Sequence, residues 1–326
     1  MARDNRLDTL KGILIILVIL GHVIQGIERH NYNVINHGVM GLIYIFHMPL
    51  FTLISGYLTN SPDNEPSRVT WRRILDTTIT LIIFQLLSYL WIIVDGGDVR
   101  LVLTIKSVPF GILWYLMSLI YWRIMLWCTP RALLNKPYLY LLIALVISVL
   151  SGFTGWGNPL ALQRTLNFYI FFLIGFYYRQ GKIDARWWNN NRLHAALMIV
   201  LLAVIFFFYP NCGRVMNGAE EYGLRDVPEK LIVLACSISI SVFLFNTVRD
   251  NKWLRVIGRD SMFYYLYHIF IVNSVLCHLV KTYHWPTAFP FVLVYTTVVV
   301  LVLVLLCKVT FLKWLTHPTR PLFKRQ

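Results

Sequence analysis

Charged residues are scarce in this chain, and their scarcity excludes an ordinary soluble protein. Asp, Glu, Lys and Arg make up only 14% of the 326 residues, against about 25% in soluble proteins, and 57% of the residues are hydrophobic. Long apolar runs alternate with short charged breaks. Ten membrane-spanning helices of about 20 residues occupy roughly 200 positions, which leaves no room for a large soluble domain.

The five cysteines form no CxxC pair, so the sequence predicts neither a zinc site nor a disulfide framework. The HExxH, Walker and GxSxG motifs are also absent, and zinc-dependent hydrolysis, ATP-driven pumping and lipase chemistry lose support. No repeat and no Pro-rich or Gly/Ser-rich linker divides the chain. We therefore expect one membrane domain over 1–326, with no metal and no permanently bound cofactor.

Basic residues are abundant, and their placement sets the expected topology. The formal net charge is +15, with 30 Lys and Arg in short clusters between apolar runs, which does not favour nucleic-acid binding. The breaks between the apolar runs alternate in basic content. The set that includes both termini holds 19 basic residues and the intervening set holds 6, so both termini are predicted in the cytoplasm. We expect an all-α, multi-pass protein of the inner (cytoplasmic) membrane, its first apolar run a retained helix rather than a signal peptide. The predicted spans are 12–27, 39–58, 74–94, 108–127, 137–152, 165–180, 193–210, 229–248, 261–281 and 289–312.

Histidine is the residue expected to carry acid–base chemistry inside the membrane, because all 15 carboxylates map to loops or helix ends. His22 follows Lys11 by three helical turns plus about 20°, so the two share a face and lie about 16 Å apart along the axis. Asp8 falls within about 40° of the same face. Two interpretations stay open. Either a catalytic base stands above a phosphate site for coenzyme A, whose pantetheine arm has a similar length, or a histidine is hydrogen-bonded between helices beside an interfacial lysine.

Other polar residues within the apolar runs also have two interpretations. His47 precedes Pro49, which is expected to kink its helix. Either the kinked helix lines a cavity, or His47 stabilises the kink. His268 lies among tyrosines, including Tyr265, whose hydroxyls bind an acceptor or anchor an aromatic interface. Ser55 stands beside a glycine, where helices approach closely.

Arginine and aromatic residues gather toward the predicted outer ends of two spans. Arg164 opens one span, and Trp114 and Tyr115 lie in the outer half of another. A planar guanidinium with exposed aromatic rings suits a polar or anionic, sugar-like ligand. An aromatic belt with one interfacial arginine explains the same residues without a ligand. Arg123 lies about one turn from a predicted cytoplasmic end, which its side chain can reach.

Five segments follow one another in an order and spacing that resemble the acyltransferase-3 family of multi-pass membrane acyltransferases. They are RLDTLKGILIILVILGH at 6–22, FHMPLFTLISGY at 46–57, LWYL at 113–116, Arg164 with FFLIGF at 171–176, and IGRDSMFYYLYH at 257–268. The resemblance covers nearly the whole chain, and it is strongest to the sugar O-acetyltransferase branch, which includes fucose 4-O-acetylase-like proteins.

The resemblance implies a ten-helix membrane domain that passes an acyl group, usually acetyl, from cytoplasmic acyl-CoA to a saccharide hydroxyl. The acceptor is a cell-surface glycan or its lipid-linked precursor. The family's motif of a basic residue followed by histidine falls on Lys11 and His22, although many members carry arginine at the first position. Arg6 and Asp8 match the start of that motif. Acetyl-CoA is then a donor substrate, and the bilayer and a saccharide are the partners.

The sequence thus predicts three groups of site residues. His22 and His47 are catalytic, with His22 either a general base or a transient acyl-histidine nucleophile. The donor is expected at Lys11, Arg6, Asp8 and Arg123, and the acceptor at Arg164, Trp114, Tyr115, Ser55, Tyr265 and His268. The main rival function is a transporter or exporter of glycan or lipid-linked intermediates, although inverted repeats and broken helices in matched halves are not found. A structural membrane subunit is a third reading, which leaves the shared face of Lys11 and His22 unexplained.

Overall fold

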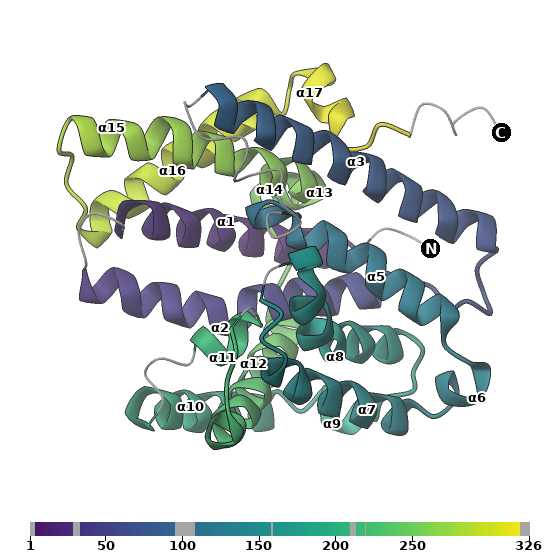
Figure 1. Ribbon diagram of the computed structural model, residues 1–326. Helices are drawn as coiled ribbons and strands as arrows, with labels where there is room; N and C mark the ends of the chain where they lie inside the picture. Colours follow the sequence, from purple (N-terminus) through teal and green to yellow (C-terminus); the bar gives the residue numbers. More distant parts are fainter. Residues whose placement is uncertain are drawn as a thin grey trace. The chain divides into compact units, whose positions relative to one another are not determined.

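The computed structural model describes residues 4–28, 33–94, 108–157, 159–208, 213–218 and 220–319. Within these ranges the chain is helical and has no strand (Figure 1). The longer helices are α1 (Asn5–Glu28), α2 (Val34–Tyr57), α3 (Ser67–Val94), α5 (Trp114–Cys128), α7 (Pro137–Leu150), α8 (Leu162–Arg179), α10 (Asn191–Phe208), α12 (Val227–Thr247), α14 (Ser261–Phe270) and α16 (Phe289–Leu306). The shorter helices are α6 (Arg131–Leu134), α9 (Ala185–Trp188), α11 (Gly213–Asn217), α13 (Lys252–Arg259), α15 (Cys277–Thr282) and α17 (Thr310–Leu315). Single turns are η2 (Gly111–Leu113), η3 (Ser151–Phe153), η4 (Pro159–Ala161), η5 (Leu224–Asp226) and the π-helical η6 (Ile271–Leu276).

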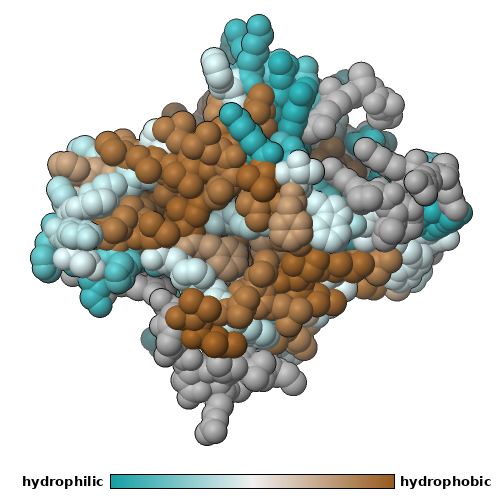
Figure 2. Space-filling view, turned by 90° about the horizontal axis from the view of Figure 1, so that it is seen from above, coloured by the Kyte–Doolittle hydropathy of each residue, from teal (hydrophilic) through white to brown (hydrophobic). Residues whose placement is uncertain are grey.

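Nine helices in the described ranges are long and apolar enough to cross a membrane, which confirms the prediction of an all-α, multi-pass protein. Four of these spans join a helix to neighbouring short turns, as in Ser261–Thr282, which combines α14, η6 and α15. Large side chains such as Phe206, Phe207 and Phe208 of α10 are 73–75% exposed. Figure 2 shows broad hydrophobic areas on the face that it draws. Such surface is stable against lipid and unfavourable in water.

One predicted span is short in the structure, as expected, and another ends early. The span expected at 137–152 is α7, of 14 residues, extended by η3 to Phe153, and it is shorter than the nine long spans. The rise of α7 alone, about 21 Å, falls short of a hydrocarbon core of about 30 Å. The span expected at 289–312 ends at Leu306, because the backbone becomes extended at Val309 before α17 begins. The prediction that both termini face the cytoplasm stays a prediction.

The chain divides into two compact units. Unit 1 comprises Met1–Phe51 and Ile240–Thr316, and α13, α14, α15 and α16 pack against its helix α1. The backbones of α1 and α13 touch: a Cβ atom on Gly12 would lie 2.0 Å from the carbonyl oxygen of Leu254, and one on Gly258 would lie 1.7 Å from that of Asp8. Only glycine permits this approach. Helix α13 was not expected from the sequence, and it anchors the start of α1.

Unit 2 comprises Thr52–Ser239 and His317–Gln326. Helix α8 is buried along most of its length, with α5 and α7 beside it. The indole Nε1 of Trp122 donates a hydrogen bond to the carbonyl of Thr165 at 2.8 Å. A Cβ atom on Gly175 would lie 1.9 Å from the carbonyl oxygen of Leu53, so α8 also contacts the end of α2. The division leaves the single membrane domain over 1–326 a prediction.

A fully buried lysine lies inside unit 2. Lys230 of α12 has no exposed surface, and its ammonium donates to the carbonyl of Val215 at 2.8 Å and to Oδ1 of Asn167. The Asn167 amide in turn donates to the carbonyl of Met216 at 2.8 Å. These bonds satisfy a side chain that is otherwise very costly in an apolar interior.

Candidate active site

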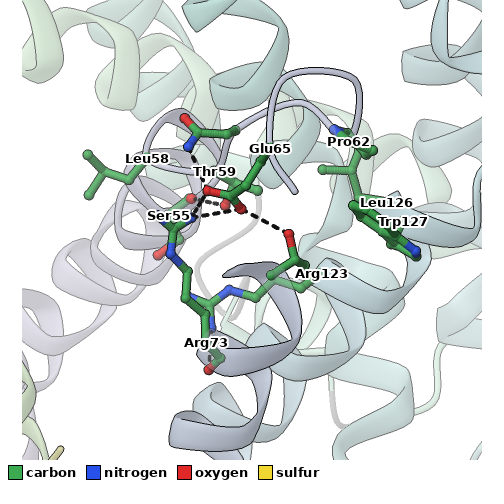
Figure 3. Close-up of a pocket in the computed structure, with 11 residues that line it drawn as sticks. Ser55, Leu58, Thr59, Pro62, Glu65, Arg73, Arg123, Leu126 and Trp127 are labelled. Carbon is green, nitrogen blue, oxygen red and sulfur yellow. Dashed lines mark hydrogen bonds and ion pairs between the residues drawn. The ribbon is translucent and has the colours of Figure 1, made fainter. Parts of the chain in front are cut away.

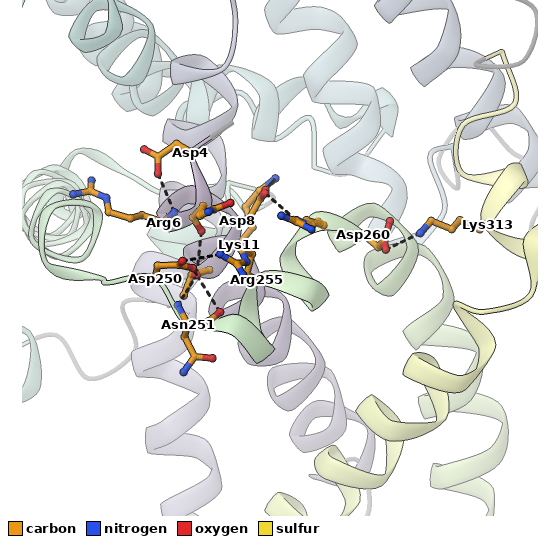
Figure 4. A network of polar contacts seen from close by, with 12 residues as sticks. Asp4, Arg6, Asp8, Lys11, Asp250, Asn251, Arg255, Asp260 and Lys313 are labelled. Atoms are coloured by element: carbon orange, nitrogen blue, oxygen red, sulfur yellow. Dashed lines mark hydrogen bonds and ion pairs between the residues drawn. The ribbon is translucent and has the colours of Figure 1, made fainter. Parts of the chain in front are cut away.

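The predicted donor residues of unit 1 meet where α1 begins (Figure 4). The Lys11 ammonium lies 2.8 Å from Oδ1 of Asp8, whose side chain is only 3% exposed, and the guanidinium Nε of Arg259 lies 3.8 Å from Oδ2. We call these three residues the Asp8 cluster. Arg6 is exposed, and its backbone N–H donates to Asp4. Within these three residues, two cations face one carboxylate.

A second set of contacts holds α13 against this cluster. The Thr9 hydroxyl donates to Oδ1 of Asp250 at 3.2 Å and accepts from the backbone N–H of Asn251 at 3.1 Å. Asn251 also caps α13 by accepting from two of its first backbone amides. The Arg255 guanidinium lies 2.7 Å from Oδ2 of Asp250. The sequence reading missed Arg259 and these partners, because no pattern in a charged loop shows which helix it contacts.

His22 of α1 and His268 of α14 lie in ring contact. Their ring centroids are 5.1 Å apart, with an angle of 41° between the rings. His268 is fully buried, and its Nδ1 lies 2.8 Å from the carbonyl oxygen of Tyr265 and 3.1 Å from that of Tyr264. A carbonyl only accepts, so Nδ1 carries the proton and the Nε2 lone pair is free to accept one. That Nε2 is buried and has no hydrogen-bond partner in the part of the chain that the structure describes.

The third predicted histidine belongs to the same unit. His47 is buried, its Nδ1 lies 2.7 Å from the carbonyl oxygen of Ile43, and its ring packs edge-on against Tyr44 with centroids 5.0 Å apart. His47 and His22 belong to the same compact unit. Unit 1 therefore brings together His22, His47 and His268, which the sequence had placed on three separate spans.

The helix that carries His268 is irregular directly beyond it. Residues Ile271–Leu276 form a π-helical turn between α14 and α15, and such turns often occur at functional sites. Opposite this turn, a Cβ atom on Gly26 would lie 2.4 Å from Sγ of Cys277 and 3.8 Å from Cγ1 of Val272. This close contact holds the C-terminal end of α1 against the irregular helix formed by α14, η6 and α15. Helical periodicity in the sequence gives no sign of the extra residue in this turn.

Unit 2 contains a separate polar pocket of about 140 Å³ (Figure 3). Arg73, Arg123 and Ser55 line it together with Glu65, which is buried and lies 2.8 Å from the Arg73 guanidinium. Asn60 and Thr70 also donate to the Glu65 carboxylate, at 2.8 and 2.9 Å. Nη1 of Arg123 donates to the hydroxyl of Thr77 at 2.9 Å. Arg123 was predicted from the sequence, whereas Glu65 and Arg73 were not.

The predicted acceptor residues of unit 2 form a chain of contacts. The Arg164 guanidinium lies 5.1 Å from the ring centroid of Trp114, which packs edge-on against Tyr115 with centroids 5.7 Å apart. The Tyr115 hydroxyl lies 2.8 Å from that of Ser55. The two other predicted acceptor residues, Tyr265 and His268, belong to unit 1, where Tyr265 supplies a carbonyl that orients His268.

The chain was compared with known families and proteins. The sequence model of the acyltransferase-3 family, described as "Acyltransferase domain", matches residues 4–307. Nodulation protein NolL of Sinorhizobium fredii is 52% identical over 59 residues, and that of Mesorhizobium japonicum is 46% identical over 59 residues. Each match covers 18% of this chain and only 16% of the relative. No solved structure matches the chain.

Proposed function

Because the chain belongs to the acyltransferase-3 family, we propose that it is a membrane O-acyltransferase that moves an acetyl or other short acyl group from cytoplasmic acyl-CoA to a hydroxyl of a cell-surface glycan or its lipid-linked precursor. One observation carries the proposal most directly. His22 is in ring contact with His268, and it lies on the helix face that carries Asp8 and Lys11.

The Asp8 cluster suits the donor end of such a site. Lys11 and Arg259 supply two cations, and Arg6 adds a third at the exposed start of α1. The rise from Lys11 to His22 is about 16 Å, close to the length of a stretched pantetheine arm. A coenzyme A whose phosphates contact the cluster therefore presents its thioester near His22. In unit 2, Arg123 is the predicted donor contact, and the pocket that it lines supplies a further guanidinium from Arg73.

The reaction needs one group that takes up a proton and later returns it. The acceptor hydroxyl gives its proton to the His22 imidazole, and its oxygen attacks the thioester carbonyl. The carbon–sulfur bond breaks, the imidazolium returns the proton to the departing thiolate, and the products are an acyl ester and free coenzyme A. In the alternative mechanism, the His22 imidazole attacks the thioester, coenzyme A leaves as the thiolate, and the acyl-histidine then transfers its acyl group to the hydroxyl. Both routes start from a neutral His22 imidazole.

The test is transfer of label from radioactive acetyl-CoA to a membrane glycolipid extract by the purified full-length protein. We expect label in the glycan with the wild type and a loss of at least about 100-fold with His22→Ala. Lys11→Ala is expected to raise the KM for acetyl-CoA about tenfold and to change kcat less, because it weakens donor binding. His278→Ala is the matched control, since His278 is an exposed histidine of the same unit.

Acetyl-CoA alone should also raise the unfolding temperature of the wild type, as any ligand that binds the folded state does. Near-wild-type transfer by a correctly inserted His22→Ala protein contradicts the catalytic role of His22. No transfer with any extract, together with no stabilisation by acetyl-CoA, contradicts the acyltransferase itself and favours the transporter.

A further inference from the structure

Besides the polar pocket of unit 2, the structure has a cavity in unit 1 that plays no part in the mechanism above. It has a volume of about 280 Å³ and lies at the end of α1 opposite the Asp8 cluster, between Gly26 and Ile27 of α1, the end of α15, and the residues that follow it. Cys277, Lys281, His284 and Trp285 also line it. We call it the Trp285 cavity. Its size fits one sugar ring with its substituents.

The lining of the Trp285 cavity combines an aromatic wall with cationic and polar groups. The Trp285 indole is 39% exposed, and its ring centroid lies 6.2 Å from that of Tyr283 and 6.0 Å from that of Tyr295. Among the side chains that the structure describes, no carboxylate lines the cavity, and Lys281 forms no ion pair. An aromatic face beside an ammonium is suited to a sugar ring that carries an anionic group.

The rim of the cavity is held in place before any ligand binds. The Trp285 backbone N–H donates to the carbonyl of Val280 at 3.1 Å. The side-chain amide of Asn36, from α2, donates to the carbonyl of Thr287 at 2.9 Å. The Tyr295 hydroxyl donates to the carbonyl of Pro286 at 2.9 Å. A rim fixed by three separate bonds loses little conformational entropy when a ligand binds. This is the property of a binding site rather than of a loose surface loop.

The Trp285 cavity begins about one helical turn along α1 from His22, which is in ring contact with His268. Gly26 follows His22 by four residues, so the two share a face of α1 and lie about 6 Å apart along its axis. Lys11 is about 22 Å from Gly26 along the same axis. The order along α1 is therefore a cationic cluster, a histidine in contact with a second histidine, and then an aromatic cavity. A donor entering at one end and an acceptor entering at the other would meet at His22.

We propose that the Trp285 cavity binds the acceptor, a saccharide that bears a phosphate or carboxylate group. Its sugar ring stacks on Trp285, its anionic group pairs with Lys281, and its hydroxyl points toward His22. The proposal rests on the acyltransferase function above and adds the substrate class and its position. The anionic group has two sources, the phosphate that links a precursor to its lipid or the carboxylate of an acidic sugar, and separate acceptor fractions distinguish them.

The first experiment measures steady-state kinetics of acetyl transfer with two acceptor fractions, a lipid-linked saccharide fraction and a delipidated acidic polysaccharide. Trp285→Ala and Lys281→Ala are each expected to raise the apparent KM for the acceptor about tenfold, with the KM for acetyl-CoA unchanged. Trp314→Ala and Lys308→Ala are the matched controls, because both residues are exposed in unit 1 and lie outside the cavity. The fraction whose KM responds to Lys281→Ala identifies the source of the anion.

Folding of each variant is checked by the rise in unfolding temperature that acetyl-CoA produces, which should equal that of the wild type. An acceptor KM within twofold of the wild-type value in both Trp285→Ala and Lys281→Ala overturns the cavity as the acceptor site. Transfer that is otherwise intact leaves the acyltransferase function standing. No transfer by the wild type, with no stabilisation by acetyl-CoA, overturns both.

The second experiment uses Cys277 as a reporter inside the cavity. A variant that keeps only this cysteine is made with Cys128→Ser, Cys212→Ser, Cys236→Ser and Cys307→Ser. A small water-soluble maleimide is expected to modify Cys277, and the responsive acceptor fraction is expected to slow that modification at least fivefold, while acetyl-CoA leaves its rate unchanged. Equal rates with and without acceptor overturn the proposal, and so does protection by acetyl-CoA alone.

Discussion

The imidazole of His268 lies 5.1 Å from that of His22, and its Nδ1 is occupied by the carbonyls of Tyr264 and Tyr265. One side of the His268 ring is thus fixed as a donor, and Nε2 keeps a lone pair in a buried position with no partner among the described residues. A proton taken up by His22 creates a positive charge in ring contact with the neutral His268, whose dipole stabilises it. We therefore expect His268 to support catalysis through His22.

His268→Asn tests this support. The asparagine amide occupies the place of Nδ1 and keeps a donor for the Tyr265 carbonyl, but it puts nothing at Nε2. We expect kcat for acetyl transfer to fall about 100-fold, with the KM for acetyl-CoA unchanged and the unfolding temperature shifted by less than about 3 °C. His278→Asn serves as the control, and a kcat above about half of the wild-type value in His268→Asn contradicts the role.

The contact between α1 and α13 predicts that Gly258 does not tolerate a side chain. A Cβ atom there would lie 1.7 Å from the carbonyl oxygen of Asp8, which is backbone and has no room to move aside. Gly258→Ala should lower the free energy of unfolding by about 3 kcal/mol or more. Gly41→Ala is the control, since nothing lies within 4 Å of that Cβ position, and alanine favours the helix there. Equal unfolding temperatures of the two variants in detergent would show that α13 does not pack on α1 in this way.

The Asp8 cluster predicts a measurable cost when its carboxylate is neutralised. In Asp8→Asn, the charges of Lys11 and Arg259 face an amide that balances neither. Because both cations are partly exposed, we expect a loss of only about 1–2 kcal/mol in the free energy of unfolding. The difference from the wild type should shrink in 1 M salt, where exposed charges are screened. Asp4→Asn, a change at an exposed residue of the same segment, should leave stability unchanged, and equal losses in both variants contradict the assignment.

The buried lysine of unit 2 should be structural. Lys230→Ala removes the donor for the Val215 carbonyl and for Asn167, and it leaves a space where the side chain stood. We expect a loss of about 2–4 kcal/mol in the free energy of unfolding, with no change in the KM for acetyl-CoA. Lys136→Ala, at an exposed lysine of the same unit, should have no effect on either quantity. A changed KM for acetyl-CoA in a stable Lys230→Ala protein would assign this lysine to the donor instead.

The spans could be predicted because hydropathy and length determine whether a helix crosses a membrane, and these are local properties. The face shared by Lys11 and His22 could also be predicted, since both residues lie on one uninterrupted helix. One span was predicted to end too late. The helix after Phe289 stops at Leu306 although Phe311 and Leu312 are still apolar, so hydropathy continued past the end of the helix.

The histidine pair and α13 could not be predicted, because both depend on contacts between distant segments. His22 and His268 each looked like an isolated polar residue in its own span, and only packing brings their rings together. Helix α13 reads as a charged loop, since nothing in KWLRVIGR shows that Gly258 touches the backbone of α1. Glu65 lies in a polar loop, yet it is buried by three donors from other positions.

The π-helical turn at Ile271–Leu276 gives this span an unusual response to changes of length. A π turn holds one residue more than an α turn, so deleting a single residue there leaves a regular helix rather than a broken one. Because the π turn already accommodates that residue, the side chains beyond the deletion would keep nearly the same orientation around the axis. His268 would keep its place beside His22, and Cys277 would stay opposite Gly26. A deletion in a regular stretch of the same helix would instead rotate everything beyond it by about 100°. The π turn is therefore the place in this span where the chain length can change by one residue while the contacts at both ends are kept.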